Sequence, residues 1–523
     1  MSTNTPQTIN DCKNFQDVIA YIDAEYKSMP RPFKNGAISN TAGENQGSAK
    51  VLSYGYLHNL SEEETLKLFR EHYDAVLADP AGDNHQNIRN FIKTGWAGVE
   101  FPEGFALNSI TINKNIANMP ANYLFRDIGQ RIGKFLEANP DKKDELIRMG
   151  IGDVKLPLPK VAVDAGIKAF QRMGDEALGY DFAEPQKELL DAIVGYYKGQ
   201  GVTIQPSEIF INDGAKPDTA NLARIFGDNY TIAFQDPSYP VYVNRHAMAG
   251  HLGPYDFDAG KWSRAIYLPM TAENNFVPEL PGELANLIYL CSPNNPTGAV
   301  MTYDQLKKWV DYANENKSVI IYDGAYEVFI TNEPNAKPGD RIPHSIFEIP
   351  GAEKCAIEIR SFSKDAGFTG LRCGYMVIPN ALERGGKKLR DLWNSSQGTH
   401  TNGVSYPVQC AAAAIYSPEG QKQIQDILAV YKTNTATLKD GLIDAGFEVF
   451  GAKHAPYLWT RAQNGMGSWE AFDYFLNTPG LHIACTPGEG FGKSGKGFIR
   501  FTGFCANVDV PKEAARRIKQ ASR

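Results

Sequence analysis

Residues 356–372 read AIEIRSFSKDAGFTGLR: a short β-branched run followed at once by a polar, glycine-containing segment that carries Lys364. Similar runs occur at 208–211 (EIFI), 230–234 (YTIAF), 287–291 (LIYLC) and 318–323 (SVIIYD), with helical patterns such as residues 304–316 between them. Strands that alternate with helices predict an α/β fold, with a mostly parallel sheet wrapped by helices.

Before residue 106 and after about residue 408, strands and helices no longer alternate in this way. A long helical pattern near 408–440 leads into a smaller α+β part. Before residue 106 the chain reads as a mostly helical module, with an amphipathic helix near 14–26, a polar loop at 35–50, and a helix that starts at a capping box on Ser61. A chain of 523 residues is too long for one core. We therefore expect three domains: 1–105, 106–440 and 441–523.

Composition narrows the class of protein. The net charge of −7 argues against a nucleic-acid or anionic-membrane partner, and no apolar stretch is long enough to span a bilayer. The N-terminal residues are polar and do not form a secretory signal. The seven cysteines are scattered without a CxxC pair, so neither a disulfide framework nor a metal site is expected. A cytoplasmic location fits these features best.

Polar residues stand at the ends of several predicted strands: Asp236, Asn295, Asp323 and Ser361. In open α/β sheets a ligand binds beyond the carboxyl ends of the strands, so these residues predict the site. They are the types that pyridoxal phosphate requires. This cofactor needs a lysine for a Schiff base, an acid for its pyridine nitrogen, a donor for its phenolic oxygen, and a cradle for its phosphate.

Lys364 is the candidate for the Schiff base, because an amine among small residues is partly desolvated and easily deprotonated. Asp323 is the candidate acid, and Tyr326 and Asn295 are the candidate donors to the phenolic oxygen. Each has a simpler alternative: a lysine in an exposed loop, an aspartate that caps the next segment, or an asparagine in a proline-rich turn.

The remaining candidates surround the phosphate, the ring and the substrate. Ser361, Ser363 and Arg372 are phosphate-binding types, and Gly214-Ala215-Lys216 opens a helix whose free N–H groups suit an anion. Tyr239 could stack on the ring; otherwise it is a core aromatic. Arg500 lies in an apolar run and suits a substrate carboxylate, with a structural salt bridge as the alternative.

At these residues the chain resembles the fold-type I, class I and II aminotransferases that use pyridoxal phosphate. The wider family is marked by SPNNPTG (292–298) and SFSK (361–364). The runs DPSYPVY (236–242), LPMTAENNFVPELP (268–281) and NGVSYPVQ (402–409) resemble more narrowly the LL-diaminopimelate aminotransferases. The likeness extends from about residue 122 to the C-terminus.

The resemblance implies a homodimer, and it implies roles position by position. Lys364 would also shuttle the proton. Tyr180 matches the tyrosine that reaches the phosphate in the neighbouring subunit. The residues implied around the substrate are Tyr123, Gly152, Lys216, Asn402 and Arg500. One departure follows Tyr180, because Ala183 stands where the family has a glutamate, and Glu184 comes one place later.

The resemblance to this narrower family implies transfer of an amino group between glutamate and the diaminopimelate/tetrahydrodipicolinate pair in lysine biosynthesis. Its substrates would be amino acids and 2-oxo acids. The alternatives are an aminotransferase of different specificity, a decarboxylase or lyase on the same fold, or a binding protein with a vestigial site. The intact set of Lys364, Asp323, Asn295 and Arg372 argues against the last alternative.

The N-terminal module resembles the HopJ-type effector family through LHNLS (57–61), DNHQNIRNF (83–91) and GWAGV (95–99). We expect His58, His85 and Trp96 to be core and capping residues rather than ligands. Because every group that the cofactor needs lies beyond residue 106, the module is not expected to take part in the reaction.

Overall fold

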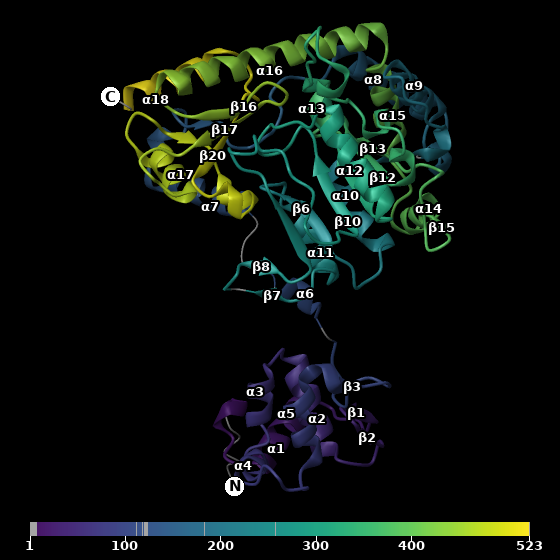
Figure 1. The fold of residues 1–523 in the computed structure, drawn as a ribbon, viewed down its shortest axis with the longest axis vertical. Helices are drawn as coiled ribbons and strands as arrows, with labels where there is room; N and C mark the ends of the chain where they lie inside the picture. The colour runs from purple at the N-terminus through teal and green to yellow at the C-terminus, as the bar shows by residue number, and fades with distance from the viewer. Residues whose placement is uncertain are drawn as a thin grey trace. The chain divides into compact units, whose positions relative to one another are not determined.

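The structure is a computed structural model that describes residues 8–110, 112–117, 119, 124–182, 184–256 and 258–521. It consists of two compact units, Met1–Asn118 and Met119–Arg523, each with its own hydrophobic core (Figure 1).

The first unit is mostly helical, as expected. Its helices are α1 (Phe15–Glu25), α2 (Gln46–Leu57), α3 (Glu62–Lys67), α4 (Glu71–Ala78) and α5 (Gln86–Thr94). They accompany a small antiparallel sheet of β2 (Ile38–Asn40), β1 (Phe33–Asn35) and β3 (Val99–Glu100). The prediction of one loop over 35–50 is wrong, because β2 and the start of α2 lie there. The helix predicted from Ser61 begins where expected but is interrupted at Arg70, whose φ is +49°.

The core of this unit extends past the predicted boundary at residue 105. Ala106 and Leu107 are buried with Ile22, Leu52 and Phe91, and Met29 donates its backbone N–H to the Ala106 carbonyl at 2.7 Å. The segment after residue 105 therefore packs with the helical module.

The second unit is built on a seven-stranded sheet (Figure 1). In spatial order its strands are β5 (Ile209–Asn212), β13 (Gly374–Val377), β12 (Ala356–Ser361), β11 (Val319–Asp323), β10 (Leu287–Cys291), β6 (Ile232–Asp236) and β9 (Ala265–Pro269). All neighbours pair in parallel except β13, which is antiparallel to both β12 and β5. The mostly parallel α/β sheet predicted from the sequence is confirmed.

The predicted bounds of the individual strands agree with the structure to different degrees. β10 and β12 have the predicted bounds, and β11 begins one residue later than predicted. β6 is shifted toward the C-terminus, so Asp236 is its last residue rather than a residue after it. β9 and β13 were not predicted.

Both faces of the sheet are covered. Along β11, Ile320 belongs to one buried cluster with Trp309 of α12 (Tyr303–Glu315), and Ile321 belongs to another with Trp393 of α14 (Leu389–His400). Alternate residues of a strand point to opposite faces, so a strand buried on both sides is largely apolar. This explains the apolar runs of β10 and β11, whereas β12 also buries the charged Glu358 and Arg360.

The smaller α+β part has an antiparallel sheet of β16 (Val449–Gly451), β17 (Tyr457–Arg461), β20 (Phe498–Thr502) and β19 (Thr486–Pro487), with α17 (Ser468–Asn477) and α18 (Asp509–Ala521). Its core also takes in Ile128 and Phe135 of α7 (Leu124–Ala138). The predicted long helical pattern is two helices, α15 (Tyr406–Ala414) and α16 (Pro418–Asp444). α16 packs against both α8 (Lys160–Asp175) and α18.

The register of the parallel strands places the candidate residues together. Cys291 of β10 is opposite Asp323 of β11, and Asp323 is opposite Ile359 of β12. These strands therefore end at the same edge of the sheet, where Asn295, Asp323 and Ser361 leave it.

The separate cores predict that the second unit folds alone. A chain that begins at Met119 should melt within about 1 °C of the corresponding transition of the full chain, a shift that corresponds to roughly 1 kcal/mol for a unit of this size. Differential scanning calorimetry of both proteins measures this. Aggregation of the shortened chain, or loss of its cooperative transition, would show that the first unit is needed for folding.

Candidate active site

A cavity of about 290 Å³ opens at the carboxyl ends of the parallel strands. It brings together most of the residues predicted from the sequence. They are Gly152, Ala215, Lys216, Tyr239, Asn295, Asp323, Tyr326, Ser361, Ser363, Lys364, Arg372 and Arg500. Their positions span more than three hundred residues of sequence, so the fold rather than local spacing assembles them.

Lys364 lies in the short helix α13 (Phe362–Asp365), directly after β12. Its Nζ donates a hydrogen bond to the Gly152 carbonyl and lies 5.5 Å from the centroid of the Phe504 ring. Burial lowers the pKa of Lys364 to about 8; the Asp153 carboxylate opposes this shift, and the cations of Arg500 and Arg372 add to it. The unprotonated, nucleophilic amine is therefore more populated near neutral pH than it is for an ordinary lysine.

Asp323 ends β11 in a buried position. Its Oδ2 accepts a hydrogen bond from the Tyr242 hydroxyl at 2.6 Å, and its Oδ1 accepts from the Ala325 N–H at 3.0 Å. Burial raises the pKa of Asp323, while these hydrogen bonds and the Arg360 cation act in the opposite direction. A cation placed beside this carboxylate would favour its ionised form.

Arg500, in β20, is 1% exposed and orients the Asn295 amide. One guanidinium nitrogen donates to Asn295 Oδ1 at 2.6 Å, and the other terminal nitrogen donates to the Gly150 carbonyl at 2.6 Å. Because the oxygen of the Asn295 amide accepts from Arg500, its NH₂ group is the part that can donate to a ligand. The guanidinium lies 4.4 Å from the centroid of the Tyr457 ring.

Tyr326 and Tyr457 form a hydroxyl pair at the side of the cavity. Their hydroxyl oxygens are 2.6 Å apart, and both side chains are buried. Tyr457 and Tyr242 both line the cavity, but neither was predicted as a site residue. Each contacts its partner across a long stretch of chain, so no local pattern marks it.

Hydroxyl and guanidinium groups gather at another part of the cavity. The Ser361 hydroxyl accepts from the Ser363 N–H at 3.2 Å, and Arg372 donates to the Ser363 hydroxyl at 3.4 Å. Gly214 precedes α10 (Ala215–Leu222) with φ +112°, and a Cβ there would stand 2.6 Å from the Arg372 guanidinium. Glycine therefore lets Arg372 approach the start of this helix, where free N–H groups favour an anion.

These groups fit pyridoxal phosphate. The hydroxyls, Arg372 and the start of α10 suit the phosphate, and Asp323 is a buried acid for the ring nitrogen. Lys364 is an amine with a lowered pKa in the same cavity. With the Asn295 amide as a donor for the phenolic oxygen, residues of one chain offer a group for each of the four requirements of the cofactor.

Three predicted residues do not line this cavity. Tyr180, in a short 3-10 helix (Tyr180–Phe182), is 78% exposed. Asn402 and Glu184 are also exposed, and the Glu184 carbonyl accepts a hydrogen bond from the Gln409 side chain at 3.1 Å. The predictions for Tyr123 and Ala183 fall outside the described residues.

The histidines of the first unit have structural contacts. His58 accepts or donates one hydrogen bond with the Tyr26 hydroxyl at 2.7 Å and stacks on Tyr54, and His85 is the residue before α5. The Trp96 indole donates to the Leu60 carbonyl at 3.1 Å. Among the described residues, no three His, Cys, Asp or Glu side chains cluster as metal ligands would. In the same residues, no helix has the length and apolar character required to cross a membrane.

Comparison with known families and proteins gives two separate matches. Residues 144–518 match the model described as aminotransferase class I and II, and residues 4–107 match the model described as HopJ type III effector protein. The first match covers the second unit with its cavity, and the second covers most of the helical unit.

Individual proteins extend the first match. The LL-diaminopimelate aminotransferases of Agathobacter rectalis and Bacteroides fragilis are 47% and 45% identical to this chain over 416 residues, which are 78% of this chain and 98–99% of theirs. The structure of L,L-diaminopimelate aminotransferase from Chlamydomonas reinhardtii is 38% identical, with a TM-score of 0.73. It is matched over its whole length and over 80% of this chain.

Identity at this level over nearly the whole length of the relatives, together with the cavity described above, leads to one conclusion. The chain belongs to the LL-diaminopimelate aminotransferase family of the class I and II aminotransferases, whose cofactor is pyridoxal phosphate, and it carries an additional N-terminal HopJ domain.

Proposed function

We propose that this aminotransferase moves an amino group between LL-diaminopimelate and 2-oxoglutarate, with tetrahydrodipicolinate and glutamate as the other pair, in lysine biosynthesis. The observation that carries the proposal is that Lys364, Asp323 and Arg372 line one cavity in a chain so similar to the diaminopimelate enzymes. Its substrates are thus an amino acid and a 2-oxo acid.

Pyridoxal phosphate, when bound, supplies an electron sink for negative charge at the substrate α-carbon. Lys364 would hold the cofactor through Nζ; once the substrate amine has displaced it there, its free amine would move a proton at that carbon, which its lowered pKa permits. Asp323 would keep a proton on the ring nitrogen, with Tyr242 holding the Asp323 carboxylate in place. Asn295 and Tyr326 would donate to the phenolic oxygen.

Ser361, Ser363, Arg372 and the first residues of α10, Ala215 and Lys216, would hold the phosphate, and Tyr239 would stack on the ring. Arg500 binds the α-carboxylate of the substrate, because it places a cation in a buried part of the cavity. Gly152, Lys216 and Tyr123 complete the substrate pocket in this proposal.

We propose that the enzyme is a homodimer in which Tyr180, Asn402 and Glu184 act at the site of the neighbouring subunit or at its entrance. The support comes from α8, the helix before Tyr180. It exposes an apolar stripe of Val163, Ile167 and Phe170, spaced i, i+4 and i+7, with Phe170 66% exposed. Such an exposed apolar face is typical of a protein interface.

The free cysteines are consistent with the proposed cytoplasmic location, where thiols are kept reduced.

The role of Lys364 predicts a clear result. Lys364→Ala should abolish turnover and the visible absorbance of the lysine-bound cofactor, because no other amine occupies its place after β12. Absorbance spectra and a coupled assay measure both. Lys422→Ala, which removes an exposed ion pair with Asp426 on α16, is the control and should behave like the native enzyme. Native absorbance in Lys364→Ala would remove the central assignment.

Asp323→Asn should keep the cofactor bound but lower kcat by about 100-fold or more, roughly 2.7 kcal/mol, because the neutral amide no longer favours a protonated ring nitrogen. Tyr242→Phe keeps the acid and loses only its hydrogen bond, so its effect should be smaller. Steady-state kinetics measure both variants. If kcat of Asp323→Asn stays within two-fold of native, another group pairs with the nitrogen.

The substrate assignment depends on the loop after Tyr180. LL-diaminopimelate carries a second ammonium and carboxylate, and we propose that Glu184 serves its distal ammonium in place of the glutamate that Ala183 replaces. Glu184→Gln should lower kcat/KM for LL-diaminopimelate by about ten-fold, or 1.4 kcal/mol, while the exposed Glu188→Gln should not. A native enzyme that rejects LL-diaminopimelate but accepts aspartate would overturn this substrate and leave the aminotransferase intact.

A further inference from the structure

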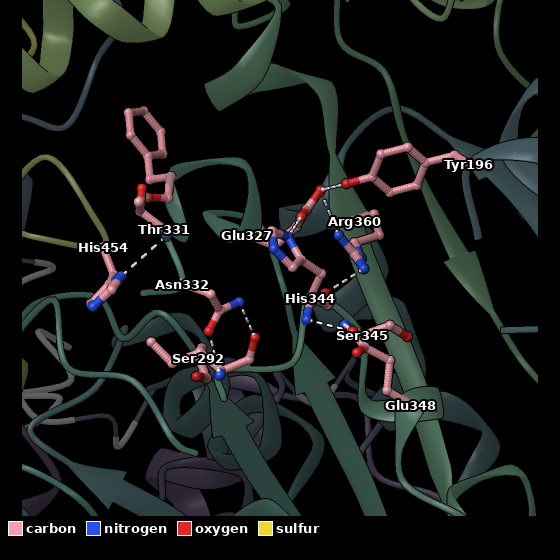
Figure 2. A network of polar contacts seen from close by, with 12 residues as sticks. Tyr196, Ser292, Glu327, Thr331, Asn332, His344, Ser345, Glu348, Arg360 and His454 are labelled. Carbon is pink, nitrogen blue, oxygen red and sulfur yellow. Dashed lines mark hydrogen bonds and ion pairs between the residues drawn. The ribbon is translucent and has the colours of Figure 1, made fainter. Parts of the chain in front are cut away.

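A network of polar contacts among buried charges is centred on Glu327 and Arg360 (Figure 2). Arg360 of β12 is between two carboxylates: its NH1 is 2.8 Å from Glu327 Oε1, and its Nε is 2.8 Å from Glu358 Oε1. The three side chains are 4%, 7% and 0% exposed, in the order Arg360, Glu327 and Glu358. A buried ion pair of this kind costs desolvation energy, so it contributes geometry more than stability.

Every charged atom of the network has a partner. Glu327 also accepts from the Tyr196 hydroxyl at 2.6 Å and lies 2.9 Å from His344 Nδ1. Arg360 donates through NH2 to the His344 carbonyl at 2.7 Å. Glu358 accepts from the hydroxyls of Ser345, at 2.6 Å, and Tyr197, at 3.1 Å. A fully satisfied polar network of this kind has one preferred arrangement.

The network joins the two segments that carry the cofactor residues. The pairing of β11 with β12 ends at Asp323 and Ile359, and beyond this point the chains diverge. One segment continues from Asp323 through Tyr326 to Glu327, and the other from Arg360 to Lys364. The Glu327–Arg360 ion pair connects them past the end of the strand pairing.

Two details place this connection directly against the site. Ala325 and Ser361 line the active-site cavity and also a second cavity of about 280 Å³, which Glu327, His344 and Arg360 line from the other side. A Cβ at Gly324 would stand 3.2 Å from Arg360 Nε, so the arginine passes closely under the segment that follows Asp323. A shift of the network would therefore move both segments.

We propose that Glu327 and Arg360 are positioning residues, which fix Asp323 and Tyr326 relative to Ser361 and Lys364 so that one cavity meets all needs of the cofactor. Neither residue lies among the groups proposed to touch cofactor or substrate. The inference rests on the proposed roles of those four residues, but not on the identity of the amino donor.

The test is the affinity of the apoprotein for pyridoxal phosphate at 25 °C, followed by the visible absorbance of the bound cofactor. Glu327→Gln should raise the dissociation constant by about ten-fold or more, equivalent to 1.4 kcal/mol, because the neutral amide no longer pairs with Arg360. Tyr196→Phe, which removes one donor to Glu327 and leaves the charges in place, should raise it by a smaller factor in the same direction.

Glu448→Gln is the matched control, since it breaks the exposed Arg461–Glu448 pair at 2.5 Å and should leave the dissociation constant unchanged. A folded Glu327→Gln with a dissociation constant within two-fold of native, and only a lower Tm, would overturn the proposal by showing a role in stability alone. If Glu327→Gln does not fold, Tyr196→Phe decides: an unchanged dissociation constant overturns the proposal.

Cofactor affinity is measured without an amino donor, so the outcome is separate from that of the substrate proposal. An enzyme that binds pyridoxal phosphate but rejects LL-diaminopimelate would fail the substrate proposal and still permit this test.

Discussion

The parallel pairing of β10, β11 and β12 is the constraint on which the site depends. It sends three segments out of the sheet at one edge, and they carry Asn295, Asp323 and Lys364. Side chains inside these strands are buried on both faces of the sheet, so the residues at and just after the strand ends are the first that can meet a ligand. Asn295, Asp323 and Lys364 therefore follow one another along the chain in the same order as their strands, β10, β11 and β12, lie in the sheet.

This constraint explains what the sequence could predict. β10 was predicted with its observed bounds because it is a short apolar run that ends at a turn, and β12 because its isoleucines mark a β-branched run despite Glu358 and Arg360. β13 was missed because Gly374–Val377 is short and contains a glycine, and its antiparallel direction has no local signal. Tyr242 and Tyr457 were missed because they contact Asp323 and Tyr326 from 81 and 131 residues away. The stretch 35–50 was predicted to be a loop because it is polar and contains glycine. It forms β2 and the start of α2 instead, because residues such as Ala49 pack into the core of the first unit.

The buried charges around Arg360 and around Lys364 differ in how well they are paired, and this difference distinguishes positioning residues from a reactive group. Around Arg360 every charge is matched by an opposite charge or a hydrogen bond, which fixes one geometry. Around Lys364 the match is incomplete: burial lowers the pKa of its amine to about 8, and no carboxylate in the described part of the chain is paired with it as an ion pair. An under-compensated amine costs stability but is reactive. We expect this arrangement where a fully paired network, here that of Arg360, keeps a reactive group, here the Lys364 amine, in a fixed position.

Reaction and specificity then occupy different parts of the second unit. The groups that meet the needs of pyridoxal phosphate come from the sheet edge, α10 and α13, and from β20 through Arg500, all of them inside packed layers. The residue expected to distinguish one amino donor from another, Glu184, lies on an exposed segment after Tyr180. Exposed segments change without disturbing a core, whereas a change at Asp323 or Arg360 disturbs buried charge. The departure at Ala183 therefore falls where substrate preference can shift while the aminotransferase reaction is retained.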